Sequence, residues 1–233
     1  MTGHNETAAF SKAERREIRE RFLQVDTSNV ADVLDQMGLP DQGLAAGFRP
    51  FPATCGKLAG WAYTIRGQMV PYDGTGDAAK MEACHGIGVD EVGVWSGDGA
   101  GICYFGELIA LGMKERGCVG ALVDGGIRDV RWIGEHNFPV YARYRTAVQS
   151  IGRWRVTGGQ EAVYLQGATS ERVVIHPGDF VLCDDDGGIV IPKAQVTDVL
   201  EAAEELTRKE ILIRQEIAEG MALQQALNKY GHV

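Results

Sequence analysis

Residues 91–129 repeat one pattern, in which a short apolar run is followed by a glycine-rich loop and a helix-forming segment. The apolar runs are residues 91–95 and 118–123, and the glycine-rich loops are residues 96–101 and 124–129. A crossover helix of this length usually joins two parallel strands of one sheet in a right-handed connection. Both strands then end at the same edge, where open α/β sheets bind ligands. The pattern therefore predicts an α/β fold whose two loops share a binding site.

Apolar periodicity and turn residues predict the elements on both sides of this stretch. Helices are expected over residues 11–24, 30–37, 78–84, 104–116 and 130–136, and after Pro192 to about residue 219. The helix over residues 30–37 is expected to be capped by one of residues 27–29. Strands are expected over residues 57–69 (one strand or two), 139–142, 172–176, 180–183 and 188–191, with a loop over 39–54 and a tight turn at 184–188. Residues 1–10 are expected to form a flexible tail. No linker or repeat interrupts residues 11–233, which are expected to form a single domain with one main core.

Charge and hydropathy narrow the partners of this domain. The net charge of −9 and the pI near 5.1 argue against binding to nucleic acid or to anionic membranes. No apolar run approaches the roughly 18 residues that span a bilayer. The five cysteines are scattered and lack the spacing of a zinc site. The sequence therefore predicts a cytoplasmic protein with reduced thiols.

The first loop leads into Gly106, Glu107, Leu108 and Ile109 at the start of a helix. A helix start offers unpaired backbone N–H groups and a partial positive charge, which suit a carboxylate or a phosphate. Gly106 would let such a ligand approach the backbone closely. Glu107 allows two interpretations, because an acid in a first helical turn either complements the helix dipole or moves a proton.

The second loop carries the adjacent glycines Gly125 and Gly126, followed by Arg128 and Asp129. The glycines permit a sharp turn, after which Arg128 and Asp129 are expected to open the next helix. Neighbouring helical side chains point about 100° apart, so one can bind an anion and the other a cation. Arginine pairs with a carboxylate in two-point fashion, and aspartate can hold Mg²⁺. The alternative is a surface ion pair that caps the helix.

These residue types together suggest the cleavage of a 2-oxo acid. Asp129 would hold a divalent cation beside the ketone oxygen, while Arg128 and the backbone at residues 106–109 bind the neighbouring carboxylate. Breaking a carbon–carbon bond beside the ketone leaves an enolate, whose charge a Lewis acid stabilises. Glu107 would move the proton through a water molecule.

Four segments carry a family resemblance. FGELIALGMKERGCVGALVDGGIRDVRWIGEHNFPVYAR resembles the class II 4-hydroxy-4-methyl-2-oxoglutarate/4-carboxy-4-hydroxy-2-oxoadipate aldolases, which belong to the superfamily of the regulator of ribonuclease activity A. The segments TSNVADVLDQMG, HPGDFVLCDDDGGIVIP and KEILIRQEIAEGMALQQALNKYG are similar as well. The resemblance covers most of residues 25–230, and its GxxRD core is specific to the superfamily.

The resemblance implies a layered αββα sandwich with a mixed or parallel central sheet, in trimers or hexamers with active sites between subunits. It makes Asp129 the ligand of Mg²⁺, Mn²⁺ or another divalent metal, and Arg128 the arginine that binds substrate. It places the pyruvyl group on residues 106–109 and links Glu107 to proton transfer. The implied reaction cleaves a 4-hydroxy-2-oxo acid to pyruvate and a carbonyl product. Oxaloacetate decarboxylation is implied too, because it passes through the same enolate.

Some features leave alternatives open. Residues 67–95 depart from the family pattern, and Asp77 stands near an expected asparagine. Glu210 interrupts the apolar stripe of the C-terminal helix, either as an exposed edge or as an acid that reaches a neighbouring subunit's site. His85 could enter the site, although a structural role is the first expectation.

The competing function is a non-catalytic regulator that binds ribonuclease partners, like the superfamily's namesake. The set of Glu107, Arg128 and Asp129 favours the enzyme, as does the extended C-terminal helix.

Overall fold

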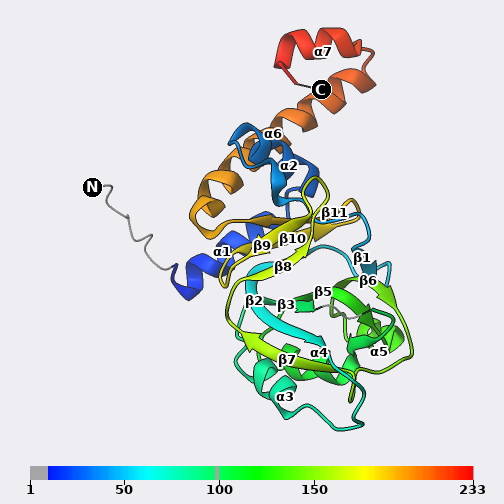
Figure 1. Ribbon diagram of the computed structural model, residues 1–233. Coiled ribbons are helices and arrows are strands. Elements are labelled where there is room, and N and C mark those ends of the chain that lie inside the picture. The colour runs from blue at the N-terminus through cyan, green and yellow to red at the C-terminus, as the bar shows by residue number, and fades with distance from the viewer. Residues whose placement is uncertain (1–9, 98–99, 233) are drawn as a thin grey trace.

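The structure, a computed structural model, describes residues 10–97 and 100–232 (Figure 1). The predicted tail lies outside the described residues except for Phe10, whose ring centroid lies 5.2 Å from that of Trp61. Two residues of the first predicted loop, Asp98 and Gly99, also lie outside them.

Helices and strands alternate in the middle of the described chain, a run of strands follows, and helices stand at both ends. The helices are α1 (Lys12–Phe22), α2 (Thr27–Gln36), α3 (Ala78–His85), α4 (Glu107–Lys114), α5 (Val130–Glu135), α6 (Val196–Ala218) and α7 (Leu223–Tyr230), with short 3-10 turns at Pro40–Gln42 and Lys193–Gln195. The strands are β1 (Arg49–Phe51), β2 (Leu58–Met69), β3 (Glu91–Gly97), β4 (Cys103–Phe105), β5 (Gly120–Ile127), β6 (Val140–Arg145), β7 (Trp154–Gly159), β8 (Val163–Gln166), β9 (Arg172–Ile175), β10 (Phe180–Asp184) and β11 (Gly187–Ile191).

Within the described ranges, nine strands form one mixed sheet. Its order is β1-β6-β5-β3-β2-β10-β11, with β4 paired to β5 and β7 paired to β2. The pairs β2–β3, β3–β5 and β5–β6 are parallel, whereas β1, β7, β10 and β11 pair in antiparallel fashion. Strands β8 and β9 form a separate antiparallel pair. The predicted α/β class with a mixed central sheet is confirmed.

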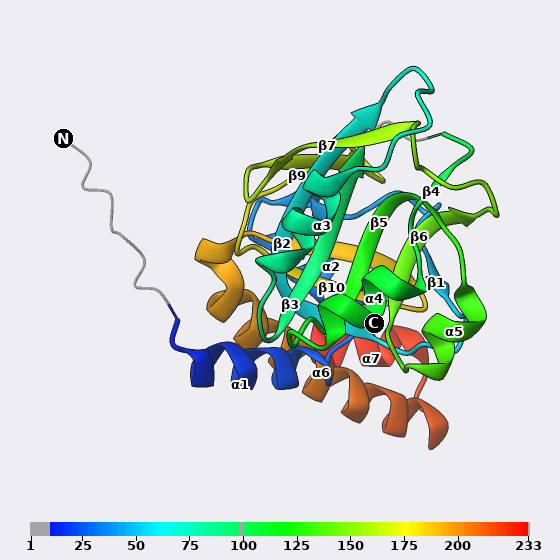
Figure 2. The ribbon, with the colours of Figure 1, turned by 90° about the horizontal axis from the view of Figure 1, so that it is seen from below.

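The strands lie between two groups of helices (Figures 1 and 2). Helices α1, α2 and α6 cover one side, where Phe22, Leu34 and Phe180 belong to one buried cluster. Helices α3, α4 and α5 cover the other side, where Trp95 and Phe105 belong to a second cluster. A third cluster connects the sheet with β8 and β9. This arrangement agrees with the predicted αββα layering and with the predicted long C-terminal helix, α6.

The helix predicted over residues 104–116 begins later, at Glu107. Cys103 and Phe105 instead pair with β5 in parallel register, which makes this segment strand β4. The ring of Tyr104 stacks on that of Trp154, with centroids 4.7 Å apart and planes 6° apart. The sheet and this aromatic contact therefore hold the backbone extended, whereas the apolar pattern alone favours a helix.

The sharp turn predicted at Gly125 and Gly126 is wrong, because both residues lie inside β5. A Cβ atom on Gly125 would lie 2.3 Å from the Tyr104 hydroxyl oxygen, and one on Gly126 would lie 2.2 Å from the Ile102 carbonyl oxygen. The glycines allow β4 to pack tightly against β5, and they mark a close approach rather than a turn. As a result, β5 is longer than the strand predicted over residues 118–123.

The sequence patterns missed several short elements. Strand β1 lies in the segment expected to be loop, and it pairs with β6. Strands β7 and β8 and helix α7 were also unpredicted. Such short elements show little periodicity and are stabilised mainly by their neighbours in the fold.

None of the helices in residues 10–97 and 100–232 has the length and apolar character of a membrane-spanning helix.

Candidate active site

The two predicted loops meet because β3 and β5 are neighbours. The strands are parallel, with Trp95 opposite Val123, so both end at the same edge of the sheet. The chain then enters α4 at Glu107 and α5 at Val130, and these two helices contact each other. The predicted shared edge is therefore confirmed for the ends of β3 and β5, although residues 124–127 continue β5 and Asp98 and Gly99 lie outside the described residues.

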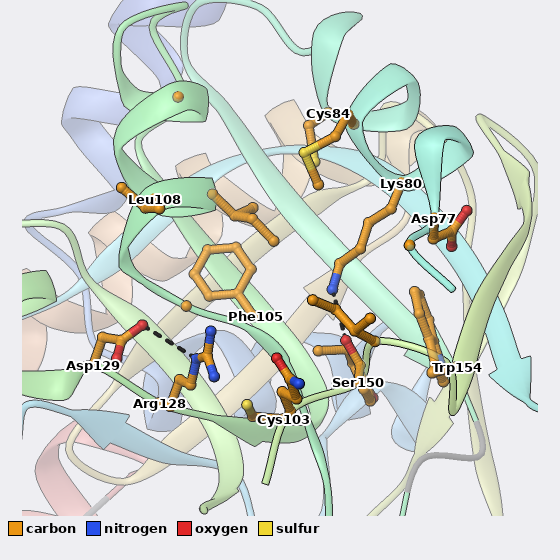
Figure 3. A pocket seen from close by; sticks show the side chains of 18 of the residues that line it. Asp77, Lys80, Cys84, Cys103, Phe105, Leu108, Arg128, Asp129, Ser150 and Trp154 are labelled. Carbon is orange, nitrogen blue, oxygen red and sulfur yellow. Dashed lines mark hydrogen bonds and ion pairs between the residues drawn. The ribbon is translucent and has the colours of Figure 1, made fainter. Parts of the chain in front are cut away.

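A cavity of about 590 Å³ opens at this edge (Figure 3). Its walls come from α3, the β4–α4 segment, the junction of β5 with α5, and the segment before β7. The lining residues are Gly76, Asp77, Lys80, Met81, Cys84, His85, Cys103, Tyr104, Phe105, Gly106, Leu108, Ile109, Gly112, Arg116, Arg128, Asp129, Gln149, Ser150, Ile151 and Trp154. This size suits a small organic acid.

Asp129 and Arg128 lie side by side at the cavity. Asp129 occupies the N-cap position of α5 in the left-handed backbone region, with φ of 59°. The helix begins at Val130, in agreement with the helix predicted over residues 130–136, and Arg128 and Asp129 lie just before its first turn. Aspartate is one of the few residue types other than glycine that adopt this region readily. Arg128 Nε lies 3.4 Å from Asp129 Oδ2, and the side chains are 43% and 40% exposed. Such an exposed pair contributes little to stability, and both groups remain open to a ligand.

Gly106 allows the start of α4 to approach Asp129. A Cβ atom on Gly106 would lie 2.8 Å from Asp129 Oδ2, and the Glu107 N–H donates to this same oxygen at 3.4 Å. The φ of Gly106 is −152°, which any residue can adopt, so close approach is the reason for glycine here. The positive end of α4 and the carboxylate of Asp129 thus face each other across the site.

The side chain of Glu107 does not join the other predicted site residues at the cavity. Its Oε1 lies 2.8 Å from His136 Nε2 at the end of α5, and Glu107 is not among the residues that line the cavity. Only 18% of this side chain is exposed. Its link to proton transfer stays a prediction that the geometry of this pocket does not favour.

The other predicted residues divide between two places. Leu108 and Ile109 line the cavity, so Gly106, Leu108, Ile109, Arg128 and Asp129 come together as expected. Glu210 lies on α6, where it pairs with Arg214 and His232 at 2.5 Å and 3.1 Å. His85 lines the cavity and contacts Arg116.

Lys80 is a pocket residue that the sequence patterns did not single out. It lies on α3, in the segment that departs from the family pattern, and only 8% of the residue is exposed. Its Nζ donates to Ser150 Oγ at 3.1 Å and lies 5.8 Å and 5.5 Å from the ring centroids of Trp95 and Trp154. A lysine in a short helix is ordinarily exposed, so no signal in the sequence reveals this burial.

Burial controls the protonation of this part of the pocket. The pKa of Lys80 is lowered to about 8, mainly by burial and in smaller part by the nearby charge of Arg128. Burial raises the pKa of Cys84 to about 11 and also raises that of Cys103, so both thiols are neutral near pH 7. The pocket therefore combines the cation of Arg128 with a lysine that can gain or lose a proton.

The implied divalent metal is compatible with Asp129. No group of three or more histidine, cysteine, aspartate or glutamate side chains that could hold a metal occurs in residues 10–97 and 100–232. Mg²⁺ does not need such a group, since it is often held by one or two carboxylates and completes its shell with water and substrate. The half-exposed carboxylate of Asp129 at the cavity fits this mode of binding.

The mixed sheet, covered by helices on both sides, defines an α/β protein with a pocket at the edge of its sheet. A family model described as RraA-like, Aldolase/RraA, matches residues 27–190. The chain belongs to this RraA-like family.

Individual proteins are similar to parts or most of the chain. Protein DlpA of Legionella pneumophila is 28% identical over 215 residues, which are 91% of this chain and 33% of DlpA. A protein of Halalkalibacterium halodurans, provisionally named a 4-hydroxy-4-methyl-2-oxoglutarate aldolase, is 40% identical over 101 residues, 40% of this chain and 42% of that protein. The chain spans less than two thirds of the curated relatives it matches.

A solved structure supports the fold. Streptomyces coelicolor RraAS2, described as an unusual member of the RNase ES inhibitor RraA protein family, superposes with a TM-score of 0.73 at 22% identity. The match covers 85% of this chain and 96% of that one. At this identity, the similarity establishes a shared fold.

Proposed function

We propose that this protein is a divalent-metal-dependent lyase that cleaves a 4-hydroxy-2-oxo acid into pyruvate and a second carbonyl compound. The observation that carries the proposal is the meeting of Arg128, Asp129 and the start of α4 at one pocket. The partial match to the Halalkalibacterium protein supports the same chemistry.

The pocket residues have separate tasks in this proposal. Arg128 binds the carboxylate of the substrate through its planar guanidinium, and the N–H groups at the start of α4 add a second set of donors. Asp129 would hold the divalent ion, Mg²⁺ or Mn²⁺, which supplies Lewis-acid stabilisation of the enolate charge when bound. Leu108 and Ile109 provide apolar contacts beside the reacting group.

Oxaloacetate is a second expected substrate. Its loss of carbon dioxide leaves the same pyruvate enolate as the aldol cleavage, so the groups that bind the pyruvyl part serve both reactions. We expect the activity on both substrates to depend on the same ion and on Arg128.

The test measures pyruvate release from 4-hydroxy-4-methyl-2-oxoglutarate and from oxaloacetate, with Mg²⁺ and with EDTA. We expect Mg²⁺-dependent release from at least one 4-substituted 2-oxo acid. Asp129→Asn is the matched variant, because asparagine has a similar shape and also tolerates the left-handed backbone while lacking the negative charge. We expect it to lose the activity and to keep the fold, as judged by circular dichroism.

Two other results would contradict parts of this proposal, and the first of them would favour the regulatory function. If the wild-type protein releases no pyruvate from any such acid with Mg²⁺ or Mn²⁺, the lyase is excluded. If Asp129→Asn is fully active, the assigned metal ligand is wrong.

A further inference from the structure

Lys80 enters the pocket from the side opposite Arg128 and Asp129 (Figure 3). Its side chain extends from α3 toward Ser150, which lies on the segment before β7. The two sides of the pocket therefore carry different groups, an anion-binding arginine on one and a buried amine on the other.

The surroundings of the Lys80 amine disfavour its charged, protonated form. Among the described residues, Lys80 takes part in no ion pair within 4 Å, and its Nζ donates a hydrogen bond to the hydroxyl of Ser150. Nζ also lies over the rings of Trp95 and Trp154, with centroids 5.8 Å and 5.5 Å away, and burial still lowers the pKa of the amine. An apolar side chain of similar length would fill this space at lower cost, which indicates that the amine is retained for chemistry.

Several titratable or charged groups act on Lys80. Burial has the largest effect on its pKa and lowers it, the charge of Arg128 lowers it as well, and the carboxylate of Asp77 at the N-cap of α3 raises it. The thiols of Cys84 and Cys103 are neutral near pH 7 and carry no charge there. With a pKa of about 8, about a tenth of the amines are neutral at pH 7 and half at pH 8. A group with this balance can both accept and donate a proton near neutral pH.

The proposed cleavage needs such a group, because the C4 hydroxyl must lose its proton as the C3–C4 bond breaks. Glu107, the acid suggested by the sequence, pairs with His136 and does not line the pocket. Lys80 lines it directly. We propose that Lys80 is the catalytic base that removes the C4 hydroxyl proton, an inference that rests on the proposed lyase function.

The proton and the electron pairs balance over the cycle. Neutral Lys80 takes the proton from the C4 hydroxyl, C4 becomes the carbonyl carbon of the leaving product, and the C3–C4 electron pair moves into the pyruvyl group as an enolate. The resulting ammonium of Lys80 then gives the proton to C3, which forms the methyl group of pyruvate and restores the neutral amine. Ser150 is a positioning residue, because its hydroxyl accepts a hydrogen bond from Nζ when the amine is directed into the pocket.

The two proposed reactions separate this role from the rest of the site. Aldol cleavage requires removal of a hydroxyl proton, whereas loss of carbon dioxide from oxaloacetate requires only the proton that the enolate gains at C3, which water can supply. We therefore expect Lys80→Met to lower kcat/KM for 4-hydroxy-4-methyl-2-oxoglutarate by about a hundredfold or more and to change oxaloacetate decarboxylation by less than about tenfold. Lys12→Met, which alters an exposed lysine on α1, is the matched control and should leave both activities unchanged.

A pH profile and a second variant complete the test. In the wild type, kcat/KM for aldol cleavage should rise about tenfold per pH unit until the pH approaches 8, and this limb should be absent from the residual activity of Lys80→Met. Lys80→Arg should be as impaired as Lys80→Met, because arginine keeps the charge and does not act as a base.

Other outcomes would overturn the assignment. Restored cleavage in Lys80→Arg would make Lys80 an anion-binding residue. If borohydride in the presence of pyruvate leaves a covalent adduct on Lys80, the amine forms an imine with pyruvate and acts as a nucleophile instead of a base. Equal loss of both reactions in Lys80→Met would exclude a role specific to the hydroxyl proton. If the wild type releases pyruvate from neither substrate, the lyase proposal itself fails, which is a distinct result.

Discussion

At the scale of single residues, the site depends on close contacts that ordinary side chains would block. Gly106 is the clearest case, since its missing Cβ lets the start of α4 reach the carboxylate of Asp129. Lys80 is the opposite case, a long side chain that the fold buries at a cost. Each residue supports a prediction.

We expect Gly106→Ala to abolish most of the proposed lyase activity and to leave the fold intact. The new methyl group would lie 2.8 Å from Asp129 Oδ2 and would displace the carboxylate from its present position. Pyruvate release and circular dichroism measure the two effects. Gly47→Ala is the control, because no atom lies within 4 Å of a Cβ atom at that position. Wild-type activity in Gly106→Ala would show that the position of Asp129 does not matter.

Lys80→Met should stabilise the protein at neutral pH. The pKa of Lys80 is lowered from 10.5 to about 8 in the folded chain, so the unfolded chain binds more protons between these values and wild-type stability rises with pH there. The variant lacks this dependence. The free energy of unfolding of Lys80→Met should therefore exceed that of the wild type at neutral pH. This excess should shrink by up to about 3 kcal/mol between about pH 7 and about pH 11.

Urea unfolding at the two pH values measures this difference. Lys12→Met serves as the control, and its difference from the wild type should stay constant. A Lys80→Met difference that does not change with pH would show that the buried amine titrates normally.

At the scale of elements, strand β5 joins the sheet to the site. It carries Gly125 and Gly126 through the contact with β4 and then ends just before Arg128. The position of Arg128 and Asp129 therefore depends on how closely these two strands pack.

We expect Gly126→Ala to lower the free energy of unfolding by about 1–3 kcal/mol, because its Cβ would lie 2.2 Å from the Ile102 carbonyl oxygen. Urea unfolding provides the measurement. Gly112→Ala in α4 is the control for stability, since a Cβ there meets no atom within 4 Å and alanine favours a helix by about 0.5–1 kcal/mol. Equal stability of the two variants would contradict the tight packing of β4 on β5.

At the scale of the whole molecule, the C-terminal region extends away from the sheet. The last part of α6 and all of α7 project beyond the other helices (Figure 1). Large apolar side chains are exposed there, including Leu212 at 52% and Leu223 at 63%. Exposed apolar groups that lie together can form a contact surface. The homotrimer or homohexamer stays a prediction.

We expect the wild-type chain to form such an oligomer in solution and the double variant Leu212→Glu, Leu223→Glu to form a smaller species. Charged groups at a buried contact would remain without partners, which opposes assembly. Light scattering after size-exclusion chromatography gives the masses, and circular dichroism shows whether each chain is folded. A monomeric wild type would contradict the predicted assembly.

The sequence by itself determined the parts that local chemistry controls. Hydrophobic periodicity predicted the long helix α6, and the repeated strand–loop–helix pattern predicted that Arg128 and Asp129 share an edge of the sheet with Gly106. These predictions hold because a parallel crossover places successive loops together whatever the remaining chain does.

Only the tertiary structure decided the rest. Gly125 and Gly126 are typical of a turn, yet β4 packs so closely that they are needed inside a strand. Lys80 has no distinguishing neighbours in the sequence and becomes a pocket residue because Trp95, Ser150 and Trp154 come from distant segments to surround it. Local sequence determines which conformations are favourable, but burial and close contact depend on residues that only the complete fold brings together.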